Sequence, residues 1–544
     1  KILWTEKPVL AQIRDVFVID DSVWIGGFKP YVTGNKKYTG PVWGPYFAVQ
    51  RDMKTGKVIK EITQENPGHH HRCYSSKATS RYILGGRRGT EFLNLDSGDV
   101  LWNSWARGIC RYGVMPANGM LYTPPHACAC YLTARLTGFG AMVSSRSKLP
   151  TAAPRLTKGP AHAAAPPDPT DATDWPTYRA DARRSGRAAA PVPSGLKVRW
   201  ETGLDADLTA PTVADGKVFV AHPDQHQLQA IDRETGKPVW SFSATGRIDS
   251  PPTIHQGRAL FGSRDGHVYS LRTTDGELAW RFRGARDPRR LTSYGQMESI
   301  SPIHGSVLVQ DEAVCFTAGR SSFLDGGIEL YRLNPRTGEV LSETAIYSPD
   351  PETGQQPKQY NSNQMPGARS DILVGDGKYL YLRDMTFTKE GVETKEKAPH
   401  LFTYTDFLDA SWPHRSYWIF GTKASISSGC SGQSRTLTYG RLLLMDEANV
   451  YGYARGKIHW SNQFLDAPYR LFGRKQGEPK ATWGVKAPMH IRAMVLAGDV
   501  IFAAGAILEH RHEATRTKGA LLVAFSTKDG KELARLPLPA APVL

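Results

Sequence analysis

A short phrase that ends in tryptophan recurs along this chain and constrains its fold more than any other feature. Residues 230–240 read AIDRETGKPVW and residues 270–280 read SLRTTDGELAW, so that the glycines of the two copies are 40 residues apart. A repeat of about 40 residues, with alternating apolar residues on both sides of a turn, is typical of a β-propeller blade. Related turns lie at 55–57, 97–99, 337–339 and 529–531.

Each copy of the phrase predicts a β-hairpin that leads into the outermost strand of a sheet. The glycine suits a turn that needs a positive φ, and the flanking residues alternate between the two faces of a strand. One four-stranded sheet cannot bury both faces alone, so neighbouring sheets must stack on it. We therefore predict an all-β fold, a β-propeller of four-stranded antiparallel blades, with about eight blades and a range of roughly seven to ten. The tryptophans expected to fill the gaps between blades are Trp102, Trp240, Trp280 and Trp460.

Composition divides the chain into three parts. Residues 1–142 carry the early blades and a group of histidines and cysteines, and residues 174–544 carry the remaining blades of the same propeller. Between them, residues 143–173 are rich in alanine and proline and contain no aromatic residue. Such a composition predicts a linker or a disordered insertion.

The formal net charge of +16, from 68 basic and 52 acidic residues, would attract an anionic partner. Acidic polysaccharide is the partner we expect; a basic surface without a specific partner is the alternative. Nucleic acid is not expected, because no nucleic-acid-binding motif accompanies the charge. The chain has no apolar run of 18 residues, so no membrane span is expected. It lacks a signal peptide and an initiating methionine, which we read as a processed or trimmed fragment, so the missing signal says little about the compartment. We expect a monomeric periplasmic or extracellular protein.

Residues 174–186, DWPTYRADARRSG, carry a resemblance to a known family. Together with the Asp-x-x-Thr-Gly-Lys-x-x-Trp phrases that follow, they resemble the PQQ-like propeller repeat proteins, which include quinoprotein dehydrogenases and the outer-membrane assembly lipoprotein BamB. The match is good over residues 174–346. The histidine-rich and cysteine-rich stretches at 68–74 and 124–130 look most like propeller proteins of planctomycete-type bacteria. The resemblance implies a fold and leaves the function open.

The quinone chemistry of the family is not expected in this chain. Quinoprotein dehydrogenases use a disulfide between adjacent cysteines and a calcium ion. Here Ala129 separates Cys128 from Cys130, and no calcium constellation can be assigned. We therefore expect neither bound PQQ nor a quinone-dependent redox reaction.

Four of the six cysteines cluster early in the chain, close to several histidines. Zinc prefers tetrahedral sulfur and nitrogen ligands, and residues two apart on a strand point the same way. The spacing predicts a structural zinc site, with His71 as an alternate ligand. A disulfide between Cys73 and Cys110, or histidines that only make hydrogen bonds in a loop, remain the alternatives. Cys315 and Cys430 are interpreted as ordinary thiols. The predicted zinc ligands are Cys73, Cys110, His126, Cys128 and Cys130.

Two clusters combine the side chains that β-elimination from a uronic acid requires. The reaction needs a cation for the carboxylate, a base for the C5 proton and an acid for the leaving oxygen. Histidine can be the base, tyrosine the acid and arginine the carboxylate clamp. A weak resemblance to propeller polysaccharide lyases, the ulvan lyases among them, points the same way. The catalytic candidates are His70, Arg72 and Tyr74 in one cluster and His414, Arg415 and Tyr417 in the other.

Three functions therefore remain open. The first is an exported lyase that cleaves an acidic, uronate-containing polysaccharide. The second is a non-catalytic, BamB-like propeller scaffold that binds a protein or a glycan. A quinone-dependent redox protein is the weakest of the three.

Overall fold

The structure, a computed structural model, describes most of the chain. The described residues are 1–7, 10, 12–29, 31–33, 36–38, 45–64, 75–86, 89–108, 111–125, 136, 138–144, 154–163, 171, 173–204, 207–293, 295–356, 365–403, 418–423, 438–455, 469–508 and 517–542. The chain forms two compact units, which are described separately. Unit 1 comprises Lys1–Lys148, Ser348–Gly367 and Ser428–Cys430; unit 2 comprises Leu149–Tyr347, Ala368–Ser427 and Ser431–Leu544.

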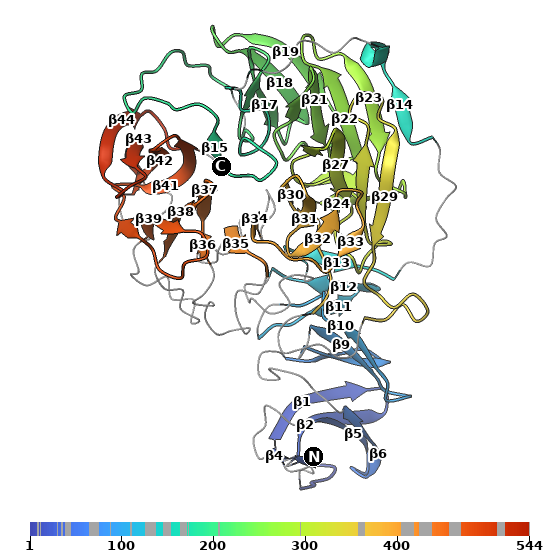
Figure 1. Cartoon of the computed structure of the whole chain (residues 1–544). Coiled ribbons are helices and arrows are strands. Elements are labelled where there is room, and N and C mark those ends of the chain that lie inside the picture. Colours follow the sequence, from blue (N-terminus) through green and yellow to red (C-terminus); the bar gives the residue numbers. More distant parts are fainter. Residues whose placement is uncertain are drawn as a thin grey trace. The chain divides into compact units, whose positions relative to one another are not determined.

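Unit 1 contains antiparallel sheets of short strands (blue in Figure 1). Its first sheet has the order β1-β2-β5-β6, and consists of Gln12–Ile19, Ser22–Phe28, Tyr46–Asp52 and Val58–Gln64. The second has the order β10-β9-β8-β7, built from Val100–Asn103, Thr90–Asn94, Tyr82–Gly85 and Lys77–Ala78. A third sheet joins β11 (Met115–Ala117), β12 (Met120–Thr123) and β13 (Gly140–Met142), and β3 (Tyr31–Thr33) pairs with β4 (Lys36–Tyr38).

Unit 2 begins with three sheets that follow the repeated phrase. The first consists of β16 (Thr212–Ala214), β17 (Lys217–His222), β18 (Gln227–Asp232) and β19 (Pro238–Ser243). The second consists of β20 (Thr253–His255), β21 (Arg258–Gly262), β22 (His267–Arg272) and β23 (Leu278–Arg283), with β14 (Leu156–Lys158) added at the edge of β23. The third consists of β26 (Leu308–Gln310), β27 (Ala313–Ala318), β28 (Ile328–Leu333) and β29 (Val340–Ile346). Between the last two, β24 (Arg290–Ser293) and β25 (Gln296–Ser299) form a separate hairpin.

The rest of unit 2 continues the pattern. One sheet joins β30 (Leu373–Gly375), β31 (Tyr379–Leu382), β32 (Met385–Thr388) and β33 (Glu393–Thr394), and another β34 (His400–Thr403), β35 (Trp418–Gly421) and β36 (Thr438–Gly440). The next joins β37 (Leu442–Met445), β38 (Asn449–Arg455), β39 (Tyr469–Lys475) and β40 (Trp483–Val485). The final sheet joins β41 (His490–Ala497), β42 (Val500–Leu508), β43 (Thr517–Ser526) and β44 (Glu532–Leu538).

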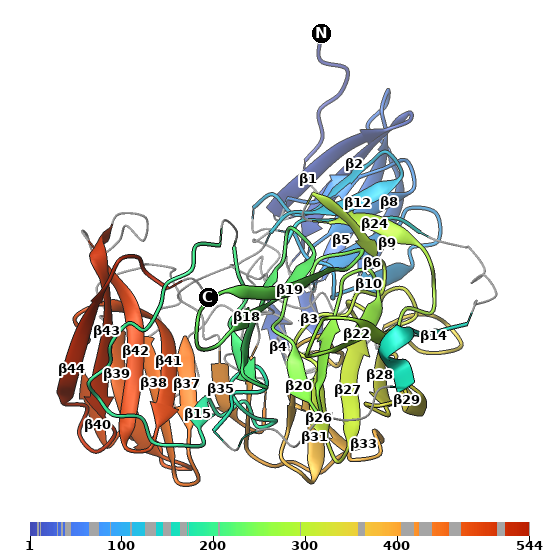
Figure 2. The same ribbon diagram turned by 90° about the horizontal axis from the view of Figure 1, so that it is seen from above.

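The first strands of consecutive sheets lie side by side in unit 2. Strand β16 lies beside β20, β20 beside β26, β26 beside β30 and β30 beside β34. In both views the sheets follow one another in chain order, from green through yellow to red (Figures 1 and 2). This is the stacking of four-stranded blades that the sequence predicts, and the all-β propeller class is confirmed. The number of about eight blades stays a prediction. Among the described residues we find no helix with the length and apolar character that a membrane crossing requires.

The tryptophan of the repeated phrase connects each sheet to the next. The Trp240 indole Nε1 donates a hydrogen bond of 2.9 Å to the Thr273 carbonyl in the turn of the following sheet. Its ring lies against Gly276, where an added Cβ would be 2.6 Å from the Trp240 Cε3 atom. Trp280 makes the equivalent bond, of 3.0 Å, to the Pro335 carbonyl. Glycine is therefore required at position 276 for two reasons: its φ is positive, and the indole fills the space that a side chain would need.

Residues 174–188 tie the first strands of unit 2 together. Backbone amides of five different sheets donate hydrogen bonds of 2.7–3.0 Å to carbonyls of this segment; the donors are Val213, Ile254, Gly375, Met445 and Leu496. Strand β15 (Arg187–Ala188) also pairs in parallel with β41, so that the first and last sheets of the unit meet on one segment.

Arg184 is the buried centre of this segment. Its side chain is 0% exposed and donates to the carbonyls of Ser306, Val307 and Leu373 at 3.2–3.4 Å. Burial lowers the pKa of Arg184 to about 10, so the guanidinium stays charged at neutral pH. Carbonyl oxygens that converge from two sheets stabilise this buried cation.

An ordered piece lies within the segment for which composition predicts a linker. Residues 154–163 include β14 and a turn of 3-10 helix, η2 (Pro160–Ala163). Strand β14 pairs antiparallel with β23 and turns its sheet into a five-stranded one. This order comes from tertiary contacts that alanine and proline content does not report.

Candidate functional site

The residues that the sequence predicts for catalysis and zinc binding lie outside the described residues. They are His70, Arg72, Tyr74, His414, Arg415 and Tyr417 for catalysis, and Cys73, Cys110, His126, Cys128 and Cys130 for zinc. The lyase constellation, the zinc site and the alternative disulfide stay predictions.

The described part of the chain contains no group of three or more His, Cys, Asp or Glu side chains that could hold a metal ion. Cys315, on β27, is a buried thiol that lies 3.7 Å from the Ala313 carbonyl. Burial raises the pKa of Cys315 to about 12, so the thiol is protonated at neutral pH. A protonated, enclosed thiol packs as a small apolar side chain.

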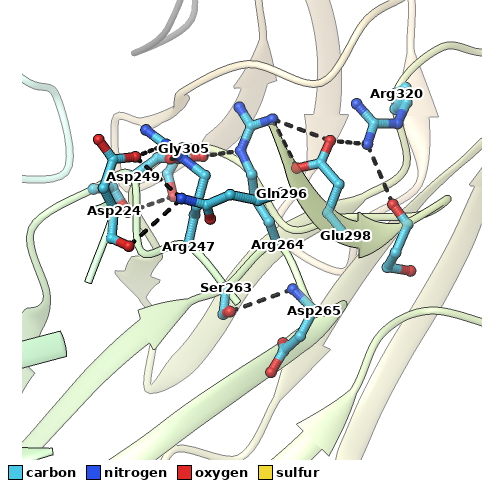
Figure 3. A network of polar contacts seen from close by, with 12 residues as sticks. Asp224, Arg247, Asp249, Ser263, Arg264, Asp265, Gln296, Glu298, Gly305 and Arg320 are labelled. Atoms are coloured by element: carbon cyan, nitrogen blue, oxygen red, sulfur yellow. Dashed lines mark hydrogen bonds and ion pairs between the residues drawn. The ribbon is translucent and has the colours of Figure 1, made fainter. Parts of the chain in front are cut away.

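A network of charged side chains lies at the strand ends of three neighbouring sheets of unit 2 (Figure 3). Arg264, in the turn between β21 and β22, is 2% exposed and pairs with Asp249, which precedes β20. Its Nη1 atom also lies 3.0 Å from Oε2 of Glu298 on β25. Arg320, which follows β27, pairs with the other oxygen of Glu298. The Glu298 carboxylate is thus held between two guanidinium groups.

The network continues to the surface on one side. Arg247 Nε lies 3.2 Å from Asp249 Oδ1, and the same guanidinium pairs with Asp224. Gln296 donates from Nε2 to Asp224 Oδ1 at 3.3 Å. Positive and negative groups therefore alternate from the surface to the interior, and the carboxylates of Asp224, Asp249 and Glu298 each face at least one arginine (Figure 3). Such a network is strongly tied to one geometry, because removing one member leaves a buried charge unpaired.

The protonation states of Glu298 and His304 suit a structural role for this network. Burial opposes ionisation of Glu298, but Arg264 and Arg320 outweigh it, so the pKa of Glu298 lies below its usual value. Burial, with the same two arginines and Arg369 nearby, holds the pKa of His304 well below the ordinary histidine value. At neutral pH Glu298 is therefore ionised and paired, and His304 is neutral.

A second polar cluster lies at the same turn between β21 and β22. The Tyr269 hydroxyl donates to Asp265 Oδ2 at 2.5 Å, and Thr245 donates to the same carboxylate. Burial raises the pKa of Asp265, but His267, Thr245 and Tyr269 outweigh it and bring the value to about 2. Burial, followed by the Asp265 charge, raises the pKa of Tyr269. A tyrosine of raised pKa is a weak general acid, so this pair suits structural support better than proton transfer.

Glu298 also anchors the separate hairpin β24–β25. The carboxylate is on β25, which ends at Ser299. Two residues later the chain reaches the buried Ser301. On the same strand Met297 is 53% exposed. Side chains alternate along a strand, so the buried Glu298 fixes the hairpin while Met297 faces solvent. An exposed large apolar side chain on an anchored hairpin is a candidate contact for another molecule.

None of the residues in this network is among the site residues predicted from the sequence. Arg264 and Asp265 stand next to Gly266 in the turn between β21 and β22, which is a weak signal in one chain. Glu298 lies 34 residues from Arg264, and only the stacking of sheets brings the two together.

Known proteins are similar to this part of the chain. Residues 182–364 match the family model described as outer membrane protein assembly factor BamB. BamB of Burkholderia pseudomallei is 31% identical over 147 residues, which cover 27% of this chain and 32% of that protein. BamB of Yersinia pestis is 25% identical over 158 residues, which cover 28% and 37%. The chain thus spans about a third of the length of these curated relatives.

Among solved structures, the quinohemoprotein alcohol dehydrogenase from Comamonas testosteroni is similar with a TM-score of 0.45 and 15% sequence identity, over 68% of this chain and 74% of that one. The matched residues 182–364 contain the phrases, the tryptophan contacts and the charged network. Over residues 182–364 the chain is therefore similar to the PQQ-like β-propeller proteins, as its repeated phrase indicates.

Proposed function

We propose that this protein is a non-catalytic propeller scaffold that binds another protein, with a role in the assembly of outer-membrane proteins. The two relatives are named outer membrane protein assembly factors, and the matching family model covers the sheets that hold the charged network. A periplasmic or extracellular location belongs to the same proposal. The lyase reading receives no support from these relatives.

The observation that carries the proposal is the hairpin β24–β25. It lies outside the four-stranded sheets, it is fixed by Glu298 between Arg264 and Arg320, and it presents Met297 to solvent. A rigid hairpin with an exposed apolar residue loses little conformational entropy on binding, which favours protein recognition. The charges beneath it are paired with each other, which suits a support better than a catalytic centre.

Site-specific photo-crosslinking tests the scaffold. A photoreactive phenylalanine at Met297 should crosslink to a component of the outer-membrane assembly machinery in the source cell envelope. The matched control is Val340 on β29, which is 44% exposed in the same unit and lies away from the hairpin. Equal crosslinking at both positions, or none at Met297, would contradict the proposed contact.

A uronate assay tests the competing lyase. Ulvan, pectate, alginate and glycosaminoglycans should give no rise in the ultraviolet absorbance of unsaturated uronate. A rise in absorbance that disappears in the His70→Ala or His414→Ala variant would contradict the scaffold. The protein would then be a lyase, with the acidic polysaccharide as its substrate.

A further inference from the structure

Residues 154–163 lie between two neighbouring sheets of unit 2, against the edge of β23 on one side and the turn between β28 and β29 on the other. We call the surface that these two elements offer to the segment the groove. The segment runs as strand β14 and continues as the 3-10 turn η2. Its contacts with the groove have the features of peptide recognition by strand addition.

The backbone of the segment is recognised along its whole length. The Arg283 amide donates to the Arg155 carbonyl, and the Gly159 amide donates to the Ala279 carbonyl, both at 2.8 Å. Beyond the strand, the buried Arg258 guanidinium donates from Nη1 to the Ala161 carbonyl at 3.0 Å. Main-chain hydrogen bonds of this kind give affinity without fixing the sequence.

The arginine of the segment supplies specificity at one end. The Arg155 guanidinium carbon lies 4.8 Å from the ring centroids of both Phe282 and Tyr331. Its Nη1 atom lies 3.0 Å from Glu343 Oε2. The groove thus offers a cation two aromatic rings and a carboxylate.

Apolar and small residues supply specificity further along. A Cβ at Gly338 would lie 2.7 Å from Leu156 Cδ1, so the leucine fills the space beside that turn. Ala161 is 0% exposed and joins the core cluster that contains Trp280. At Gly159 a Cβ would lie 2.2 Å from the Leu278 carbonyl oxygen, so no larger residue fits there.

Strand β19 is the equivalent of β23 in the preceding sheet, and it is the edge strand of that sheet. On β19, Val239 is 47% exposed, whereas Ala279 at the same place on β23 is 0% exposed. The smaller Ala279 leaves room for the segment, and the segment completes the burial of Trp280, which is 0% exposed. The groove is therefore a feature of this sheet and not a general property of the blades.

We propose that this groove is a peptide-binding site, specific for an extended segment of the pattern Arg-Leu-x-x-Gly-x-Ala, and that residues 155–163 occupy it as an intramolecular ligand. The site is separate from the hairpin β24–β25 and stands whether or not the scaffold role holds. The chain's own segment is bound through the contacts that an external peptide would make.

The experiment vacates the groove and supplies the ligand from outside. In one variant a Gly-Ser sequence of equal length replaces residues 155–163. A fluorescent peptide PRLTKGPAHA, which copies residues 154–163, is titrated against it by fluorescence anisotropy. The peptide should bind this variant and not the intact protein. A Gly159→Ala peptide should bind about tenfold more weakly or worse, and a Thr157→Ala peptide, altered at an exposed position, within about twofold.

A second variant guards against misfolding of the first. Gly159→Ala in the intact chain should expel the segment, so that this protein binds the parent peptide while the Thr157→Ala protein does not. If the Gly-Ser variant fails to fold, this pair decides. Absence of binding to a folded, vacated groove, or equal affinity for the parent and Gly159→Ala peptides, would overturn the proposal.

Discussion

Replacement of Gly276 by alanine should destabilise the protein more than replacement of Gly216, although the two glycines have similar backbones. The φ angle is +75° at Gly276 and +69° at Gly216. A Cβ at Gly276 would lie 2.6 Å from Trp240 Cε3, whereas nothing lies within 4 Å of a Cβ at Gly216. The pair therefore separates the contribution of the turn from the contribution of the tryptophan.

The expected magnitudes follow from these two geometries. Alanine in the left-handed conformation is destabilising by about 1 kcal/mol at either position. At Gly276 the indole must also move, and overpacking adds about 1–3 kcal/mol. The free energy of unfolding should therefore fall by about 1 kcal/mol for Gly216→Ala and by about 2–4 kcal/mol for Gly276→Ala.

Urea denaturation of the single variants and of a double mutant measures this difference. In a Trp240→Ala background, Gly276→Ala should be destabilising by only about 1 kcal/mol, because the clash is gone. Equal destabilisation by Gly216→Ala and Gly276→Ala in the parent protein would refute the reasoning. So would a Gly276→Ala effect that is unchanged by removal of the indole.

Three further predictions concern the buried charges and the cysteines. Arg184→Met should lower the free energy of unfolding by about 3–5 kcal/mol, because it leaves buried carbonyls unpaired. Arg183→Met, at an exposed position, should change the free energy of unfolding by less than about 0.5 kcal/mol. Chemical denaturation compares the two variants. The pKa of Glu298 is lowered, so its ionised form stabilises the folded protein above the ordinary glutamate pKa and this contribution is lost as pH falls through the folded value. The stability difference between the parent and Glu298→Gln should therefore shrink on acidification, and a constant difference would contradict the pairing. Elemental analysis should find zinc in the parent protein, a lower zinc content in Cys128→Ser and an unchanged zinc content in Cys315→Ser. Equal zinc contents in the two variants would exclude the predicted site.

Local turn chemistry explains why the fold could be predicted from the sequence. Asp232 accepts hydrogen bonds from the Glu234 and Thr235 amides at 3.1 and 2.7 Å, and Gly236 has a φ of +69°. Each of these interactions lies within five residues, so the sequence alone carries the signal. The contact of Trp240 with the next turn follows from the same repeat.

Two stretches of unit 2 depart from the repeated pattern. Residues 418–421 form β35, which is the middle strand of its sheet, between β34 and β36. No strand forms near Thr202, yet Trp200 donates to the Arg233 carbonyl at 2.9 Å. The tryptophan contact persists without the strand, because it depends on the facing turn and not on a ladder partner.

The charged network and the peptide groove could not be predicted in this way. Arg155 and Glu343 are 188 residues apart, and their pairing depends on where two sheets meet. Composition predicts a linker or a disordered insertion that includes residues 154–163, and it does not predict β14, because it measures what a segment can bury by itself and not what a neighbouring sheet offers it. Long-range complementarity of this kind leaves little trace in one sequence.

The segment 174–188 has a consequence for how unit 2 is assembled. Its hydrogen-bond partners are spread from Val213 to Leu496, and all of them leave the ribosome after it. The segment cannot complete its hydrogen bonds until the final sheet is made, whereas the carbonyl partners of Arg184 are all synthesised by Leu373. Contacts of such long sequence separation form slowly, and closure of the unit becomes a late, all-or-none event. A chain stalled before β41 would leave the Gly186 carbonyl and strand β15 without their partners on the final sheet, so the ring of sheets could not close.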